Sequence, residues 1–206
     1  MNTKIRKFIQ VLFLGVFLLV MVLNKAQLWM GFIFLSIILA AFFGRFYCGF
    51  ACPINTLMQP ATWLGKKLGV QKKQVPEILK SQKPRWIAFG LFFIGLCYTI
   101  YTITHGRKFP LPLIIIPLGL LTAFFINEKS WHRYLCPWGV LFSLTSKFSK
   151  YGIKSKGCSS CNLCKNNCPG DAIVVENGKT AVVDTTHCLL CFDCKKICPT
   201  KAMSYK

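Results

Sequence analysis

The residues best suited to chemistry in this chain are its 12 cysteines, eight of which form two identical runs near the carboxyl end. The runs are Cys158-x2-Cys161-x2-Cys164-x3-Cys168-Pro169 and, thirty residues later, Cys188-x2-Cys191-x2-Cys194-x3-Cys198-Pro199. Three thiolates at this spacing wrap one iron–sulfur cube, and a fourth cysteine before proline ligates the cluster of the other run. The spacing therefore predicts two [4Fe–4S] clusters, one on Cys158, Cys161, Cys164 and Cys198, and one on Cys188, Cys191, Cys194 and Cys168.

Two other uses of these cysteines fit the spacing less well. An even number of cysteines allows a disulfide framework, but most of them are predicted below to face a reducing compartment. A zinc site usually takes two cysteine pairs separated by a long spacer, whereas each run here has four cysteines and a trailing proline. The pattern resembles the bacterial two-cluster ferredoxins over about residues 155–206.

The segment between the two runs has the pattern of a small β-hairpin. Ala172–Val175 and Ala181–Val183 are apolar, and they flank Glu176–Lys179 with Gly178 as the turn residue. The segment offers no catalytic residue, so this part of the chain is predicted to carry electrons only.

A second pair of motifs occurs earlier in the chain, 84 residues apart. They are Arg45-Phe-Tyr-Cys48-Gly-Phe-Ala-Cys52-Pro53 and Lys129-Ser-Trp-His132-Arg-Tyr-Leu-Cys136-Pro137. Three thiolates and one imidazole suit an iron–sulfur cluster or zinc, and a histidine ligand raises the potential of a cluster. We therefore predict a third metal site on Cys48, Cys52, His132 and Cys136; the alternative is that these are structural thiols and an interfacial histidine.

Four apolar segments of 16–18 residues precede or separate these motifs, at 8–23, 28–44, 86–103 and 111–126. None contains a charged residue or histidine, which predicts membrane-spanning helices near the short end of the usual length. The fourth contains Pro112 and Pro117, so we expect it to be kinked or to begin late. A cleaved signal peptide is an alternative for the first segment, but Asn24–Gln27 is a poor cleavage site and a retained hairpin is expected.

The charge distribution predicts the orientation of these helices. The chain has 26 Lys and Arg against 6 Asp and Glu, a net charge of +20. A balance this basic fits nucleic acid, anionic lipid or an acidic protein, but the basic residues cluster at the ends of apolar segments, which argues against nucleic acid. Basic residues crowd the amino terminus, residues 45–85 and the tail, while the opposite side has only Lys25, Arg107 and Lys108. Both termini are therefore predicted to be cytoplasmic.

The expected architecture has two parts. Residues 1–150 form an all-α four-helix membrane bundle with both motifs at its cytoplasmic face, and residues 151–206 form a small α+β domain with two [4Fe–4S] clusters. The predicted location is the cytoplasmic membrane, crossed several times, with the ferredoxin domain in the cytoplasm.

The chain resembles the NapH-like family of membrane ferredoxin-type proteins, which is related to the electron-transfer part of NosR-type proteins and to the accessory protein of cbb3-type oxidases. The resemblance rests on FGRFYCGFACP, on HRYLCPWG, on the four apolar segments and on the tandem cysteine runs. It implies a protein that passes electrons from quinol towards respiratory or assembly partners. The chain departs from the family pattern in having His132 where the second motif has cysteine.

The predicted function is electron transfer between a membrane quinol pool and redox partner proteins, as a subunit of a larger oxidoreductase. The apolar segments hold no histidine pair for a b-type haem and no acidic residue for a proton relay, and no Gly-rich dinucleotide motif precedes a helix. Two alternatives stay open. One is an accessory, assembly or redox-sensing role for a metalloenzyme, and the other is a membrane-anchored module whose clusters are structural.

Overall fold

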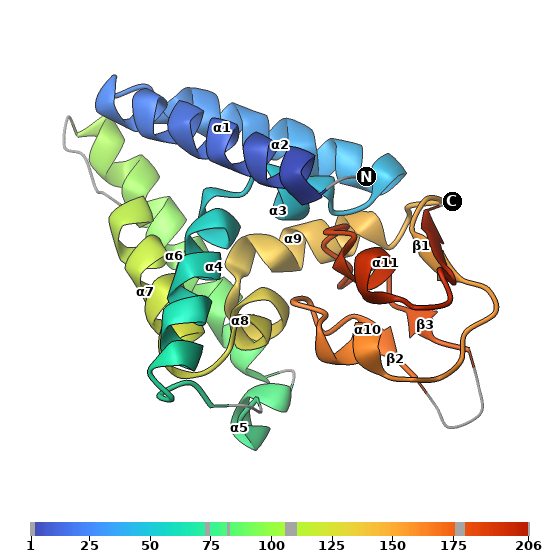
Figure 1. Ribbon diagram of the computed structural model, residues 1–206. Helices are drawn as coiled ribbons and strands as arrows, with labels where there is room; N and C mark the ends of the chain where they lie inside the picture. The colour runs from blue at the N-terminus through green and yellow to red at the C-terminus, as the bar shows by residue number, and fades with distance from the viewer. Residues whose placement is uncertain (1–2, 73–74, 82, 106–110, 176–179, 206) are drawn as a thin grey trace. The chain divides into compact units, whose positions relative to one another are not determined.

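The structure, a computed structural model, describes residues 3–72, 75–81, 83–105, 111–175 and 180–205 (Figure 1). The chain divides into two compact units, one formed by 1–56 with 141–206 and the other by 57–140. These units differ from the predicted parts, so the boundary between a membrane part and a ferredoxin part at residue 150 stays a prediction.

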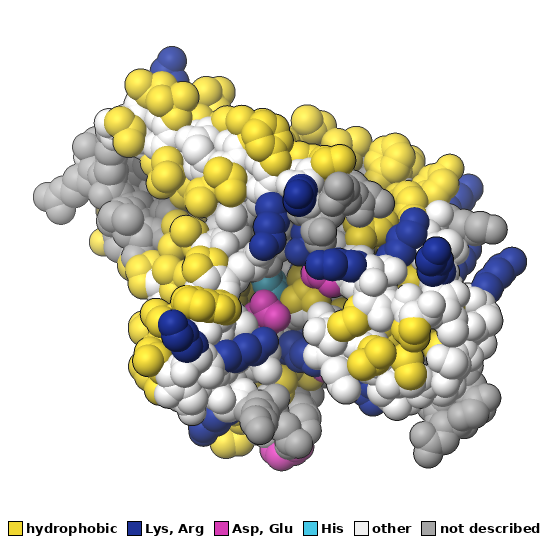
Figure 2. Space-filling view, in the orientation of Figure 1, with side chains coloured by type: hydrophobic (Ala, Val, Ile, Leu, Met, Phe, Trp, Pro, Cys, Tyr) yellow, Lys and Arg dark blue, Asp and Glu magenta, His cyan; other side chains and the backbone are white. Residues whose placement is uncertain are grey.

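The first unit begins with a hairpin of two helices, α1 (Thr3–Val22) and α2 (Ala26–Phe43). Aromatic rings fill the seam between them: Phe13 and Phe32 stack at 5.5 Å between ring centroids, and Phe17 meets Trp29 edge to face at 5.2 Å. The outward faces leave many large apolar side chains exposed, including Phe8, Leu19 and Phe42, and Figure 2 shows such side chains along both helices. Apolar exposure on this scale is typical of a surface that contacts lipid.

The first cysteine motif follows this hairpin directly. Gly44 ends α2 with a φ of 79°, and α3 (Phe46–Phe50) carries Cys48. The next helix, α4 (Pro53–Lys67), starts at the proline of the motif, a position where the missing N–H costs nothing. In the second motif, Pro137 likewise starts α9 (Pro137–Ser146).

The described residues in the carboxyl-terminal part of the first unit form four short strands and two short helices. They are β1 (Ile153–Ser155), α10 (Leu163–Asn166), β2 (Ile173–Val174), β3 (Val182–Val183), α11 (Asp193–Ile197) and β4 (Met203–Tyr205). Strand β1 pairs with β4, and β2 pairs with β3, both antiparallel. The pairing of β2 with β3 confirms the strands of the predicted hairpin, whereas its turn at Glu176–Lys179 lies outside the described residues.

The thirty-residue repeat of the cysteine runs recurs in the backbone. Three pairs of residues, thirty apart, have positive φ angles that differ by only a few degrees: Ser160 (55°) and Leu190 (52°), Asn162 (60°) and Phe192 (61°), and Asp171 (48°) and Lys201 (53°). Residues other than glycine rarely adopt a positive φ, and they keep it where the surrounding structure requires it. The two cysteine loops therefore follow the same path.

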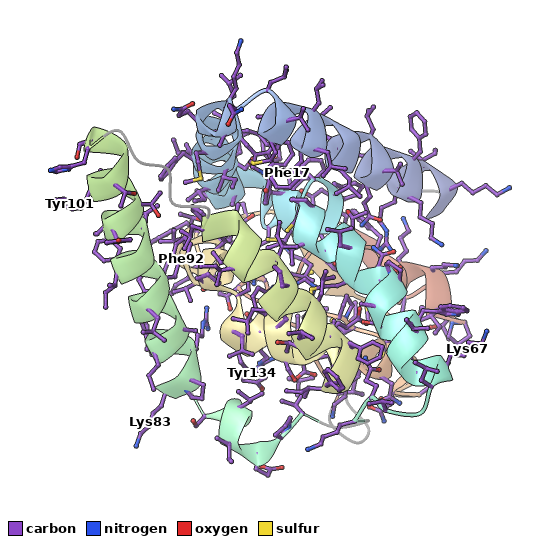
Figure 3. All side chains as sticks on the ribbon, turned by 90° about the vertical axis from the view of Figure 1, so that its left-hand side faces the viewer. Phe17, Lys67, Lys83, Phe92, Tyr101 and Tyr134 are labelled. Carbon is purple, nitrogen blue, oxygen red and sulfur yellow. The ribbon has the colours of Figure 1, made fainter. Side chains whose placement is uncertain are left out.

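The second unit contains the remaining helices. They are most of α4, then α5 (Glu77–Lys80), α6 (Lys83–Thr104), α7 (Leu111–Phe125), α8 (Glu128–Ser130) and a π-helical turn, η1 (Trp131–Leu135). Figure 3 shows Lys83 and Tyr101 near opposite ends of α6. A methyl group on Gly65 of α4 would overlap the carbonyl oxygen of Phe124, so these two backbones touch. The side chains of Arg107 and Lys108, used above for orientation, lie outside the described residues.

Three of the four predicted spans occur as helices long and apolar enough to cross a membrane. Within the described part of the chain these are Lys4–Val22, Ala26–Phe43 and Lys83–Thr102. The fourth predicted span is also a helix, but its apolar stretch, Ile114–Phe125, is shorter and Pro117 lies inside it. The described residues thus contain three candidate spans and a shorter apolar helix.

Candidate iron–sulfur centres

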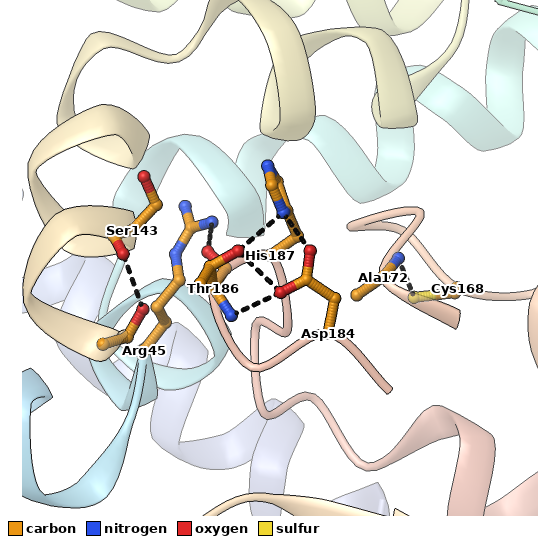
Figure 4. A network of polar contacts seen from close by, with 8 residues as sticks. Arg45, Ser143, Cys168, Ala172, Asp184, Thr186 and His187 are labelled. Carbon is orange, nitrogen blue, oxygen red and sulfur yellow. Dashed lines mark hydrogen bonds and ion pairs between the residues drawn. The ribbon is translucent and has the colours of Figure 1, made fainter. Parts of the chain in front are cut away.

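The four cysteines predicted to hold the second cluster line one pocket in the first unit. Cys168 comes from the first run and Cys188, Cys191 and Cys194 from the second, with Leu189 and Phe192 among the other residues of the wall. The backbone N–H of Ala172 donates to Cys168 Sγ at 3.3 Å (Figure 4), the kind of hydrogen bond that tunes a cluster. The structure therefore brings together one cysteine of the first run and three of the second, in the crossed pattern that the sequence predicted.

The raised pKa values of these thiols indicate that their thiolate forms require a nearby positive charge. Burial, together with the neighbouring Cys188 and Cys168, raises the pKa of Cys194 to about 12. Burial also raises the pKa of Cys188 to about 11, again with a contribution from Cys168. Several thiolates in one apolar hollow are unstable without a compensating cation, and the irons of a cluster supply that charge. The donor set therefore fits a [4Fe–4S] cluster, which would accept and release single electrons when bound.

The cysteines predicted to hold the first cluster are more exposed. Cys161 is exposed, and the backbone N–H of Ser160 donates to Cys158 Sγ at 3.4 Å. Burial raises the pKa of Cys164, and the adjacent Cys158 and Cys161 add to this effect. Cys198 and Cys158 pack against the same apolar core.

No three His, Cys, Asp or Glu side chains among the described residues are grouped as the ligands of one metal ion. A cluster of four irons takes one thiolate on each iron, so its ligands surround a hollow instead of meeting at a point. All 12 cysteines lie within the described residues, and none is in a disulfide.

A polar network holds the segment that leads into the second cysteine loop (Figure 4). Asp184 Oδ2 accepts a hydrogen bond from His187 Nδ1 at 2.6 Å, and Asp184 Oδ1 accepts from the backbone N–H of Thr186 at 2.9 Å. The Thr186 hydroxyl also donates to Asp184 Oδ1 at 2.6 Å. The hydrogen bond from His187, and then those from Thr186, hold the pKa of Asp184 below its usual range, against the effect of partial burial. The carboxylate thereby orders the backbone just before Cys188.

The motif that contains Cys48 and Cys52 packs against this same cysteine loop. A methyl group on Gly49 would overlap the carbonyl oxygen of Leu189, so only a glycine allows the two backbones to approach this closely. Gln10 of α1 donates to the carbonyl oxygen of Gly49 at 2.9 Å. Arg45 Nη1 donates to the carbonyl oxygen of Thr186 at 3.1 Å, and its Nη2 lies 3.8 Å from Cys48 Sγ. The Cys48 motif and the second cysteine loop are thus parts of one packed structure.

The motif that contains His132 and Cys136 lies in the second unit. His132 is buried in η1, and the backbone N–H of Gly139 donates to Cys136 Sγ at 3.3 Å. π-helical turns are rare in proteins, and those that occur are often found at functional sites. Because Cys48 and Cys52 belong to the first unit, the predicted four-ligand site on these residues with His132 and Cys136 stays a prediction from sequence.

Sequence reasoning missed three residues at the second cysteine loop. Arg6 was counted only as a basic residue before the first apolar segment, and no pattern distinguishes it from Lys4 or Lys7. Arg45 belongs to the motif that includes Cys48, which was a usable signal. Asp184 is one of only 6 acidic residues in the chain, and its place four residues before Cys188 was the clue available.

Comparison with known proteins supports the same class of protein. A family model described as a 4Fe-4S binding domain matches residues 25–71 and again residues 109–155. The two matches start 84 residues apart and also end 84 residues apart, which agrees with the repeat between the Cys48 and His132 motifs. No solved structure matches the chain.

Several relatives are ferredoxin-type proteins. The chain is 28% identical over 176 residues to an uncharacterized protein of Methanocaldococcus jannaschii, covering 83% of this chain and 68% of the relative. It is 28% identical over 146 residues to the methylamine utilization ferredoxin-type protein MauN of Paracoccus denitrificans, covering 64% of this chain and 50% of MauN. It is 26% identical over 185 residues to the ferredoxin-type protein NapH of Haemophilus influenzae, covering 78% of this chain and 62% of NapH.

The chain is therefore similar to ferredoxin-type proteins, matches a 4Fe-4S binding domain over two segments and has candidate membrane helices. The comparisons confirm the predicted resemblance to the NapH-like family.

Proposed function

We propose that this protein relays electrons between a membrane quinol pool and redox partner proteins, as the electron-transfer subunit of a larger oxidoreductase. The observation that carries the proposal is the packing of the Cys48 motif against the loop that supplies Cys188 and Cys191. A segment predicted to bind metal, at the end of a candidate membrane span, thereby contacts a loop predicted to bind a cluster. Its ferredoxin-type relatives support electron transport as the general role.

We propose that the two cysteine runs of the tail hold two clusters in the crossed pattern. Cys158, Cys161, Cys164 and Cys198 would hold one [4Fe–4S] cluster, and Cys188, Cys191, Cys194 and Cys168 the other. The pocket lined by the second set supports this assignment. A third site on Cys48, Cys52, His132 and Cys136 would connect the clusters to a quinol in the bilayer, and the two family matches over these motifs support a 4Fe-4S role for them.

We propose four membrane spans with both termini in the cytoplasm. The tail contacts the end of the α1–α2 hairpin at which α1 begins and α2 ends: Arg6 pairs with Asp193 at 2.8 Å, and the Tyr205 hydroxyl donates to the carbonyl oxygen of Phe43 at 3.2 Å. These contacts support an amino terminus and a ferredoxin domain on the same side. The excess of basic residues on that side favours the cytoplasm.

The experiment that tests the proposal measures iron and acid-labile sulfide per chain after anaerobic purification, followed by addition of a reduced menaquinone analogue. About twelve irons would indicate three [4Fe–4S] clusters, and bleaching of the cluster absorbance by the quinol would establish the relay. About eight irons would mean that only the tail is loaded. Full clusters that no quinol reduces would overturn the quinol link and favour the accessory or sensing role.

A further inference from the structure

Two arginines are buried beside the loop predicted to hold the second cluster. Arg6 of α1 is 7% exposed and Arg45 is 1% exposed. Arg6 Nη1 lies 2.8 Å from Asp193 Oδ2 and also donates to the carbonyl oxygen of Cys191. Arg45 reaches the carbonyl oxygen of Thr186, two residues before Cys188, at 3.1 Å. Each guanidinium is therefore held next to a predicted ligand of the same cluster.

Burying these two charges costs free energy, and their described contacts offset only part of that cost. The Nε atoms of both Arg6 and Arg45 are buried without a hydrogen-bond partner among the described residues. A buried guanidinium is stable only when negative charge lies nearby. A [4Fe–4S] cluster with four thiolate ligands carries a net charge of roughly −2 when oxidised and becomes more negative by one on reduction. The cluster would place this negative charge beside Arg45, and beside Arg6 it would add to the carboxylate of Asp193.

The surroundings of the other cysteine loop differ. Its basic neighbours are Lys156, Lys165 and Lys201, and all three are exposed. Charges in contact with water are screened and act weakly on a neighbouring group, whereas buried charges are screened much less. The two halves of the repeat thus have similar backbones but unequal electrostatic environments.

We propose that Arg6 and Arg45 raise the midpoint potential of the cluster held by Cys168, Cys188, Cys191 and Cys194 above that of the other cluster. This inference rests on the proposed electron-transfer function. Reduction adds one electron and hence one negative charge to the cluster, and the two buried guanidinium groups stabilise that charge. An electron entering the tail then resides preferentially on the cluster packed against the Cys48 motif.

Asp193 provides a test with the opposite sign. Its carboxylate pairs with Arg6 and lies two residues from Cys191, so it cancels part of the positive charge at the cluster. Removing this carboxylate leaves the Arg6 charge uncompensated. We therefore expect Arg6→Gln and Arg45→Gln to lower the midpoint potential and Asp193→Asn to raise it.

The experiment is a redox titration of the full-length holoprotein, followed by electron paramagnetic resonance, with iron and sulfide content measured for every variant. In the wild type we expect the two tail clusters to be reduced in two separate steps, of which the cluster held by Cys168, Cys188, Cys191 and Cys194 gives the step at higher potential. Arg45→Gln should shift the higher-potential step to a lower potential, whereas Arg45→Lys, which keeps the charge, should shift it much less. Lys165→Gln, beside Cys164 of the other loop, is the matched control and should leave the higher step unchanged.

The outcomes separate an electrostatic role from a structural one. Opposite shifts for Arg6→Gln and Asp193→Asn support the proposal, because loss of packing would move both variants in the same direction. Unchanged potentials in both variants, or shifts of the same sign, would overturn it. If Arg6→Gln loses its cluster, the sign of the Asp193→Asn shift decides alone. A wild-type protein without iron and sulfide would instead overturn the proposed function.

Discussion

Gly49, in the motif that contains Cys48, lies against the carbonyl oxygen of Leu189. Leu189 stands in the sequence between Cys188 and Cys191, two predicted ligands of the second cluster. Gly49 and Leu189 are 140 positions apart, and a single methyl group on Gly49 would overlap that oxygen. A methyl group on the neighbouring Gly44 would lie 3.2 Å from Leu190 Cδ1, a looser contact with a side chain. The contact places α3 directly against the second cysteine loop.

Gly49→Ala is expected to separate the motif from the cysteine loop. Overpacking of a closely packed site costs about 1–3 kcal/mol, and backbone atoms on both sides leave little room to relax. We expect slower reduction of the tail clusters by quinol and faster loss of iron to a chelator, both measured from the cluster absorbance. Gly31→Ala in α2 is the control, since a methyl group there meets nothing within 4 Å. Wild-type rates in Gly49→Ala would show that the contact is unimportant.

Asp184→Ala is expected to loosen the segment before Cys188. The variant removes the acceptor for His187 and Thr186, and hydrogen bonds to a charged group contribute about 1.5–3 kcal/mol when buried. The Asp184 side chain is 40% exposed, so solvent screening reduces the expected loss to about 1 kcal/mol. Iron release in mild denaturant measures it. Glu77→Ala, which removes an exposed acid in α5, should release iron at the wild-type rate.

Crossed ligation predicts non-additive losses of iron. Cys168→Ser and Cys188→Ser should each damage the same cluster, so the double variant should retain about four irons in the tail. Cys168→Ser with Cys164→Ser should damage both clusters and leave few or none. Iron and sulfide analysis of the two double variants distinguishes the patterns. Equal iron contents in the two double variants would contradict the crossed arrangement.

The third site predicts a similar equivalence between distant residues. Cys52→Ser and Cys136→Ser should each reduce the iron content from about twelve to about eight per chain, and the double variant should lose no more. The His132→Cys variant should keep its iron and have a lower cluster potential, because a thiolate adds negative charge. Full iron content in Cys52→Ser and in Cys136→Ser would show that these thiols are structural.

The proposed topology predicts where reporters are active. Fusions to an enzyme that works only outside the cytoplasm should be inactive after residue 206 and active after Lys25, where α1 and α2 are joined. Activity at both points would contradict the proposed cytoplasmic carboxyl terminus.

The sequence alone determined the parts of this protein that depend on local spacing. The cysteine runs, the 84-residue repeat and the apolar segments are local patterns. They predicted the paired cluster loops, which share their positive φ angles at Ser160 and Leu190, and they predicted helices at all four apolar positions. The spacing before a proline also predicted that Cys168 joins the second run, and the structure places it with Cys188, Cys191 and Cys194 at one pocket.

Only the tertiary structure decided which surfaces meet. Gly49 contacts Leu189, and Arg6 pairs with Asp193, through chain separations at which spacing carries no information. The sequence shows Arg6 as one basic residue of three, and its burial beside Cys191 follows from the packing of α1 against the tail. The physical reason is that burial and close approach depend on how whole elements pack, whereas a ligand spacing is a property of one short loop.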